Sequence, residues 1–136
     1  MPANITGACL CKAVRYTITG RIKAAANCHC NICKKMTGGA FSALVIVGDE
    51  SFCFDQGEES LNTYQVSEQA IKHFCRLCGT PLFNLHQKFP GNRMVALGSL
   101  DDPTAATPVV NVYCESMLPW VKDISALNCF EKEFRR

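Results

Sequence analysis

Short apolar stretches separated by turn residues run through most of the chain. In residues 12–19 the apolar side chains of Val14, Tyr16 and Ile18 recur at every second position, which places them on one face of an extended strand that ends at Gly20. Residues 40–47 form a longer apolar run, and we expect a buried strand there. The same pattern predicts further strands at residues 51–54, 61–66, 71–74, 81–85, 93–97 and 109–113.

Helices are expected in two places. Residues 27–36 are predicted to form a loop with a short helical turn after Cys33. From Trp120 onward, which we expect to be a packing anchor, apolar residues recur at the three- and four-residue spacing of a helix face. They are Val121, Ile124, Leu127, Phe130 and Phe134. Many short strands and few short helices predict a mainly β fold of several small antiparallel sheets.

Length and charge narrow the class of protein. The 136 residues fit one domain, residues 1–136, with a buried core. The net charge of +2 is not gathered in a basic run, so we expect no nucleic-acid partner and no anionic membrane surface. Residues 36–48 are uncharged but shorter than the about 20 apolar residues that span a bilayer. Residues 1–7 do not resemble a signal peptide, and we expect a cytoplasmic protein.

Seven of the ten cysteines fall into three clusters with short spacing. Three thiols within six residues have little structural use unless something holds the sulfurs together, and zinc prefers thiolate ligands. In a reducing compartment such cysteines indicate metal binding; a disulfide framework is the alternative for a secreted chain. The clusters are Cys9-x-Cys11, Cys28-x-Cys30-x-x-Cys33 and Cys75-x-x-Cys78.

Two pairs of cysteines are suited to a closed site. If residues 9–11 are extended, Cys9 and Cys11 point to the same side and present both sulfurs to one metal. Cys75-x-x-Cys78 followed by Gly79 has the spacing of a zinc knuckle, in which the glycine tolerates the backbone angles after the turn. The four thiolates would complete a tetrahedral, structural zinc site whose binding energy stabilises the fold.

Cys28, Cys30 and Cys33 then remain for a second zinc. Three protein ligands leave a fourth position for water, a carbonyl oxygen or a substrate thiol, which is typical of a catalytic zinc. We therefore take these three cysteines as the catalytic site, with a zinc that is easily lost. Lys34 and Lys35 follow directly and could hold a substrate carboxylate, although such residues are more often a solvated face.

Other arrangements of the ligands stay open. The central run could supply two ligands to the closed site and leave Cys9 and Cys11 spare. The second zinc could also be structural, with His29 or another cysteine as its fourth ligand, although His29 points away from its neighbours if the segment is extended. We expect the remaining candidates to be ordinary strand or loop histidines and core thiols; they are His73, His86, Cys53, Cys114 and Cys129.

The three clusters, in this order, resemble the glutathione-dependent formaldehyde-activating enzyme family, which includes centromere protein V. Further matches surround them at residues 7–11, 14–16, 28–35, 38–41, 74–82 and 98–103, and at Pro119-Trp120. Three departures leave the seven cysteines intact. Lys12 stands where the family often has glycine, Asn111 where many members have histidine, and residues 114–118 differ from the usual basic stretch.

The resemblance implies a β-rich fold and two zinc ions per chain. It implies a structural zinc on Cys9, Cys11, Cys75 and Cys78 and an open zinc on Cys28, Cys30 and Cys33. The activity it implies is that of a carbon–sulfur lyase joining or splitting glutathione and formaldehyde as S-hydroxymethylglutathione, or acting on a related thiol adduct. The expected partner is then a small-molecule thiol adduct, with glutathione as the candidate thiol. The alternative is a non-catalytic zinc module that binds another protein; metal or redox sensing by the three thiols is a weaker idea.

Overall fold

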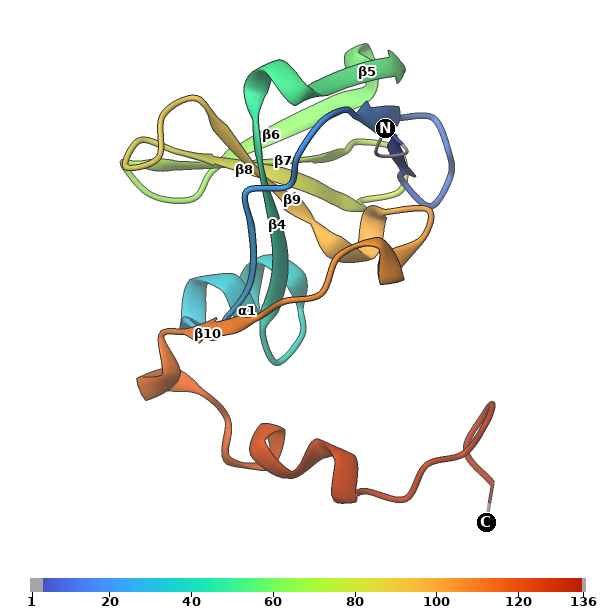
Figure 1. Ribbon diagram of the computed structural model, residues 1–136, viewed down its shortest axis with the longest axis vertical. Coiled ribbons are helices and arrows are strands. Elements are labelled where there is room, and N and C mark those ends of the chain that lie inside the picture. The colour runs from blue at the N-terminus through green and yellow to red at the C-terminus, as the bar shows by residue number, and fades with distance from the viewer. Residues whose placement is uncertain (1–3, 136) are drawn as a thin grey trace.

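The computed structural model describes residues 4–135, and its strands form two sheets (Figure 1). The smaller sheet has the order β1-β2-β5, and all its pairs are antiparallel. Its strands are β1 (Ile5–Ala8), β2 (Arg15–Ile18) and β5 (Phe52–Gln56). The larger sheet has the order β10-β3-β4-β9-β8-β7-β6, in which only β10 and β3 pair in parallel. Its strands, in chain order, are β3 (Ala24–Cys28), β4 (Ser42–Gly48), β6 (Leu61–Gln65), β7 (Ala70–Cys75), β8 (Pro81–His86), β9 (Asn92–Ala96) and β10 (Val110–Val112).

The mainly β prediction is confirmed, with shifts of a few residues at most strand ends. The structure adds β1 and β3, which the alternation of the sequence did not show. The strand expected at residues 12–19 covers only 15–18, because the chain turns through residues 9–14 before it. The amide of Lys12 donates to the carbonyl of Cys9 at 3.0 Å in this turn.

Most of the core lies between the two sheets. Tyr16 is fully buried there and stacks on Phe52, with ring centroids 4.7 Å apart. Along β4 the side chains alternate between two environments. Val45 and Val47 join the main core, whereas Leu44 belongs to a second cluster with Cys28 and Cys33.

Helix α1 (Asn31–Thr37) is the only α-helix of residues 4–135 and packs on β4. Its N-cap is Cys30, whose sulfur accepts a hydrogen bond from the Cys33 amide at 3.3 Å. Gly38 ends it in the left-handed conformation, with φ of 73°, and donates its amide to the Lys34 carbonyl at 2.8 Å. The helix thus begins before Cys33, not after it as expected.

Short 3₁₀ turns connect many of the strands. They cover Asp49–Ser51, Glu58–Ser60, Leu97–Ser99, Pro103–Ala105, Cys114–Ser116 and Pro119–Ala126. No helix within residues 4–135 combines the length and the apolar character that crossing a membrane would need.

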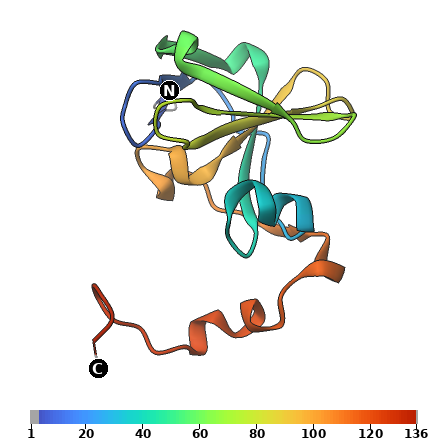
Figure 2. The same cartoon turned by 180° about the vertical axis from the view of Figure 1, so that it is seen from behind.

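The chain leaves the body after β10, and its tail runs apart from both sheets (Figures 1 and 2). The helix expected from Trp120 is only partly present: Pro119–Ala126 is a 3₁₀ helix with a non-helical break at Asp123, and the rest of the tail is irregular. Trp120 is 49% exposed, so it is not a packing anchor. Helices in proteins are stabilised chiefly by packing of their apolar face, and the apolar side chains of this tail are largely exposed.

Candidate metal centres

The first candidate centre joins the turn between β1 and β2 to the turn between β7 and β8. Cys9 and Cys11 lie in the turn between β1 and β2, Cys75 ends β7, and Cys78 lies in the turn before β8. All four sulfurs lie within 4.8 Å of one another, and the Cys9–Cys11 and Cys11–Cys75 sulfur pairs are 3.6 and 3.8 Å apart. Tetrahedral zinc with Zn–S bonds of about 2.3 Å requires sulfurs about 3.8 Å apart, so the donor set fits zinc.

Hydrogen-bond donors surround these sulfurs. The amide of Val14 lies 3.3 Å from the Cys9 sulfur, and that of Leu77 lies 3.4 Å from the Cys75 sulfur. Burial opposes ionisation of Cys78, but hydrogen bonds with Thr80 and Cys11 outweigh it and lower the pKa of Cys78 to about 5. At Cys78 the environment therefore favours the thiolate, the form of cysteine that binds metals. At Cys11 a hydrogen bond with the Ala13 backbone favours the thiolate, but desolvation and hydrogen bonds with the neighbouring thiols raise the pKa to about 11.

The backbone of this centre differs from the expected strand. Residues 9–11 are part of a turn, so the alternation of a strand does not explain how Cys9 and Cys11 converge. Lys12 has a φ of 66°, in the left-handed region that glycine adopts most easily. The left-handed backbone conformation at this position suits glycine, and Lys12 adopts it despite its side chain. Gly79, with a φ of 79°, closes the second turn as expected.

The second candidate centre contains three sulfurs, which lie where β3 ends and α1 begins. Cys28 ends β3, Cys30 caps α1, and Cys33 lies in the first turn of the helix. Their sulfurs lie within 4.8 Å of one another, and no fourth His, Cys, Asp or Glu of residues 4–135 joins them. The structure thus separates this trio from the group of four. This separation is what two metal sites, one with four cysteines and one with three, would require.

The three thiols differ in acidity. Burial raises the pKa of Cys28 and, more strongly, that of Cys33. Burial also opposes ionisation of Cys30, but hydrogen bonds from the Cys33 amide and from the neighbouring thiols outweigh it and lower its pKa. The thiolate is therefore easiest to form at the N-cap of α1, with the other two thiols beside it.

His29 lies next to this trio but is not part of it. It is almost fully buried; its ring packs on Phe41 with centroids 5.1 Å apart, and its Nε2 lies 3.0 Å from Asn111 Oδ1. Asn111 Oδ1 also accepts a hydrogen bond from Asn27 Nδ2 at 3.2 Å. The parallel pairing of β10 with β3 places Asn111 opposite Asn27, a long-range contact that sequence spacing could not reveal.

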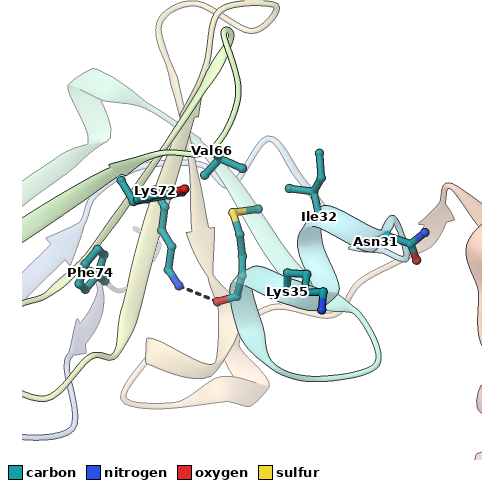
Figure 3. Close-up of a pocket in the computed structure, with 8 residues that line it drawn as sticks. Asn31, Ile32, Lys35, Val66, Lys72 and Phe74 are labelled. Carbon is teal, nitrogen blue, oxygen red and sulfur yellow. Dashed lines mark hydrogen bonds between the residues drawn. The ribbon is translucent and has the colours of Figure 1, made fainter.

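A pocket opens between α1 and the strands β6 and β7 (Figure 3). Asn31 and Ile32, which lie between Cys30 and Cys33 in the chain, line it, but none of the three cysteines does. Its volume is about 540 Å³. Met36 connects the two sites, because it packs against the cluster of Cys28 and Cys33 and also lines the pocket. The full lining is Asn31, Ile32, Lys35, Met36, Tyr64, Val66, Lys72 and Phe74. A second cavity of about 300 Å³ shares Met36 and Lys72 with it.

The two lysines singled out in the sequence lie in different environments. Lys34 donates hydrogen bonds to the carbonyl of Ser116 and, at 3.1 Å, to Asn31 Oδ1. Lys35 lines the pocket instead (Figure 3). Lys72 also lines it, donates to the Met36 carbonyl at 2.6 Å and lies 5.5 Å from the Phe74 ring. No local pattern in the sequence indicated Lys72, because only the tertiary structure brings β7 to α1.

The remaining candidates have no place at either centre. Cys53, Cys114 and Cys129 are exposed, so the expectation that they are core thiols is wrong. Cys53 lies on β5, an edge strand whose side chains face alternately inward and outward, and the other two lie beyond β10. His73 and His86 are strand residues, in β7 and β8. His73 stacks on Phe83 with centroids 4.4 Å apart.

The chain is similar to known proteins in sequence and in fold. The family model described as glutathione-dependent formaldehyde-activating enzyme matches residues 4–116. A Halomonas elongata protein, provisionally named as such an enzyme, is 26% identical over 125 residues, which cover 87% of this chain and 80% of that protein. The crystal structure of a Rhodobacter sphaeroides protein superposes with a TM-score of 0.65 at 23% identity, over 79% of this chain and 99% of the other. The last likeness concerns the fold alone.

Proposed function

Since the chain belongs to the glutathione-dependent formaldehyde-activating enzyme family, we propose that it is a zinc-dependent carbon–sulfur lyase. Its substrate is an S-hydroxymethyl adduct of glutathione or of a related thiol. Residues 1–136 act as one zinc-binding domain in the cytoplasm, with a structural zinc on Cys9, Cys11, Cys75 and Cys78 and a more labile, catalytic zinc on Cys28, Cys30 and Cys33.

One observation carries the proposal: the trio of sulfurs is incomplete, and the helix that carries it also lines a pocket. The group of four has the donors for a closed tetrahedral site, whereas the trio has three donors within residues 4–135, and α1 borders a cavity of about 540 Å³ through Asn31, Ile32, Lys35 and Met36. A site with three protein ligands is the usual form of a catalytic zinc. The pocket also favours the enzyme over the non-catalytic module, which needs no small-molecule cavity there.

The reaction splits the adduct R–S–CH₂–OH into a thiol and formaldehyde. The hydroxyl oxygen loses its proton and becomes the carbonyl oxygen, and the carbon–sulfur bond breaks with its electron pair going to sulfur. The proton ends on that sulfur, so the two products contain every atom of the adduct. A zinc ion on the trio would supply a fourth position for the substrate sulfur and stabilise it as a thiolate.

The chain's own residues bind and orient the substrate. The amide of Cys33 holds the Cys30 sulfur in place at 3.3 Å, and the apolar side chains of Leu44 and Met94 pack around Cys28 and Cys33 and limit access of water to them. Lys35 and Lys72 line the pocket and can hold a substrate carboxylate. Lys34 instead donates a hydrogen bond to the carbonyl of Ser116. Of the two neighbouring lysines, Lys35 is therefore the one that we assign to the substrate carboxylate.

Metal content and turnover test the proposal together. We expect two zinc ions per wild-type chain and exchange between thiol, formaldehyde and adduct that is faster than the uncatalysed reaction by NMR. Cys33→Ser should keep one zinc and remain folded but lose turnover. Cys53→Ser, which changes an exposed thiol away from both centres, should keep both zinc ions and full turnover. A Cys33→Ser protein with one zinc and undiminished turnover would refute the assignment.

A further inference from the structure

The pocket beside α1 combines an apolar wall with two ammonium groups (Figure 3). Ile32, Val66 and Phe74 supply apolar surface, and Tyr64 adds a second aromatic ring. Lys35 and Lys72 are its only charged side chains, since no Asp or Glu lines it. Its volume of about 540 Å³ is within the range of small-molecule sites.

The two lysines have no anionic partner among the residues that the structure describes. Among residues 4–135 the only ion pair joins Arg93 to Asp49, which does not involve this pocket. Lys72 uses one of its three N–H donors on the Met36 carbonyl. Two like charges lining one pocket raise the free energy of the empty site, and a bound carboxylate would lower it.

Building on the proposed function, we propose that this pocket selects a thiol with an apolar body and a carboxylate over the zwitterionic peptide glutathione. The substrate class is then a mercaptocarboxylic acid with an aromatic or branched aliphatic group. Glutathione brings an ammonium group in addition to its carboxylates, and the pocket offers that ammonium two lysines and no acid. The apolar wall likewise offers few partners for two peptide groups, whose desolvation without hydrogen bonds is unfavourable.

A probe without a thiol separates this inference from the lyase chemistry. We expect 3-phenylpropanoate to bind the zinc-loaded protein, and 3-phenylpropanamide to bind about tenfold or more weakly, because charge-assisted hydrogen bonds exceed neutral ones. Lys35→Gln should remove this preference, whereas Lys88→Gln, a change outside the pocket, should keep it. Equal affinity for acid and amide, or no binding of either, would overturn the inference.

Turnover completes the test. The S-hydroxymethyl adduct of 2-mercapto-3-phenylpropanoate should have a higher kcat/KM than S-hydroxymethylglutathione. Preference for the glutathione adduct would refute the selectivity while leaving the lyase intact. Binding of 3-phenylpropanoate without turnover of any adduct would refute the lyase while leaving the pocket's ligand class intact.

A different observation concerns the tail, residues 119–135, which carries apolar side chains that are about half to three-quarters exposed. Figures 1 and 2 show it running apart from the sheets from opposite sides. The exposed side chains are Trp120, Ile124, Leu127, Phe130 and Phe134. A second exposed apolar strip, at the free edge of β10, comprises Val109, Val110, Val112 and Tyr113.

We infer that two copies of this chain exchange tails, each tail covering the β10 strip of the other copy. A large side chain exposes about 150–250 Å² when bare, so the nine residues at their observed exposures present on the order of 900 Å² per copy. A stable interface needs about 800 Å² per partner. Because the chain carries both surfaces, the exchange is self-complementary and closes as a dimer.

The charge of the tail is compatible with this exchange. The tail has three basic residues against three acidic ones, so two tails do not repel each other. These are Lys122, Lys132 and Arg135 against Asp123, Glu131 and Glu133. The family match ends at residue 116, before the tail begins.

Light scattering over a concentration series tests the exchange. The wild-type protein should have twice the 15.0 kDa mass of one chain. The double variant Ile124→Asp/Phe130→Asp should be a monomer, and so should a chain ending after Met117. Phe89→Asp, at a comparably exposed phenylalanine outside the tail and the strip, should remain a dimer. A monomeric wild type, or a dimer that survives the tail changes, would overturn the inference.

Cross-linking of mixed isotope-labelled copies identifies what the tail covers. Links from Lys122 or Lys132 to the body should join heavy and light chains. Links confined to chains of one label would show that the tail packs on its own body, and would also overturn the exchange.

Discussion

Tyr16 shows how one polar atom is accommodated in the main core. Its ring is buried, and its hydroxyl lies 2.6 Å from Ser99 Oγ. Ser99 Oγ in turn donates to the Ala96 carbonyl at 2.7 Å, so the tyrosine hydroxyl is the donor of the pair. A Cβ on Gly7 would come within 2.1 Å of Tyr16 Cζ, so the absence of a side chain at Gly7 makes room for the ring.

Tyr16→Phe should therefore destabilise the protein at neutral pH and change its response to alkali. Burial raises the pKa of Tyr16 to about 12. An unfolded tyrosine ionises near pH 10, so this group's contribution is complete below pH 10 and is lost between about pH 10 and 12, at about 1.4 kcal/mol per pH unit. The lost hydrogen bond should cost about 1 kcal/mol at pH 7.

Urea unfolding of both proteins between neutral and alkaline pH measures the two effects. The free-energy difference between wild type and Tyr16→Phe should shrink above pH 10, because only the wild type has this ionisation to lose. A difference that stays constant with pH would show that the hydroxyl ionises as readily in the folded protein as in the unfolded one.

At the scale of elements, the trio of cysteines depends on how β3, α1 and β10 meet. Cys28 is the last residue of β3, and the helix begins three residues later. Strand β10 pairs with β3, and the amide of His29 donates to the carbonyl of Val112 at 3.0 Å. The side chain of Asn111 adds the contacts to Asn27 and His29. The segment that carries the trio is thus held from one side by a strand far along the chain.

Asn111→Ala should loosen this junction. It leaves the buried Nε2 of His29 without its partner, which should cost about 1–3 kcal/mol of unfolding free energy. Hydrogen exchange should speed up first at the amide of His29 and in β10. Asn62→Ala is the control, because Asn62 is exposed and its side chain accepts only from the next amide. Equal effects of the two changes would show that Asn111 does not hold the junction.

At the scale of the whole molecule, the group of four cysteines closes most of the chain. It brings the turn at Cys9 and Cys11 against the end of β7, 64 residues further on from Cys11. A metal there would act as a cross-link over a long loop, and removing it would restore the conformational freedom of that loop to the unfolded chain. The trio spans only six residues, so its cross-link restricts far less of the chain.

The two centres should accordingly differ in their effect on stability. Cys75→Ser should lower the unfolding free energy by roughly 4 kcal/mol, the scale of a cross-link over a loop of this length. Cys33→Ser should cost clearly less, and a strong chelator should destabilise the wild type about as much as Cys75→Ser does. Calorimetric and urea unfolding with matched zinc loading make the comparison. A larger cost for Cys33→Ser would reverse the structural and catalytic roles.

The sequence by itself determined the fold class and the candidate ligands. Short apolar runs between turn residues cannot form long helices, so a mainly β fold followed from spacing alone. The cysteines were equally readable because ligand spacing is local: Cys28, Cys30 and Cys33, or Cys75 and Cys78, need only one turn of chain to converge. The same local pattern overestimated the helix in the tail, where only a short 3₁₀ helix formed and the apolar side chains stay largely exposed.

Only the tertiary structure decided which distant residues meet. Strand pairing brought Asn111 to His29 and Lys72 to α1, and it placed Cys9 and Cys11 with Cys75 and Cys78. It also turned Lys35 toward the pocket and engaged its neighbour Lys34 elsewhere. The physical reason is that register and sheet order depend on the packing of whole faces, which no short window of sequence contains.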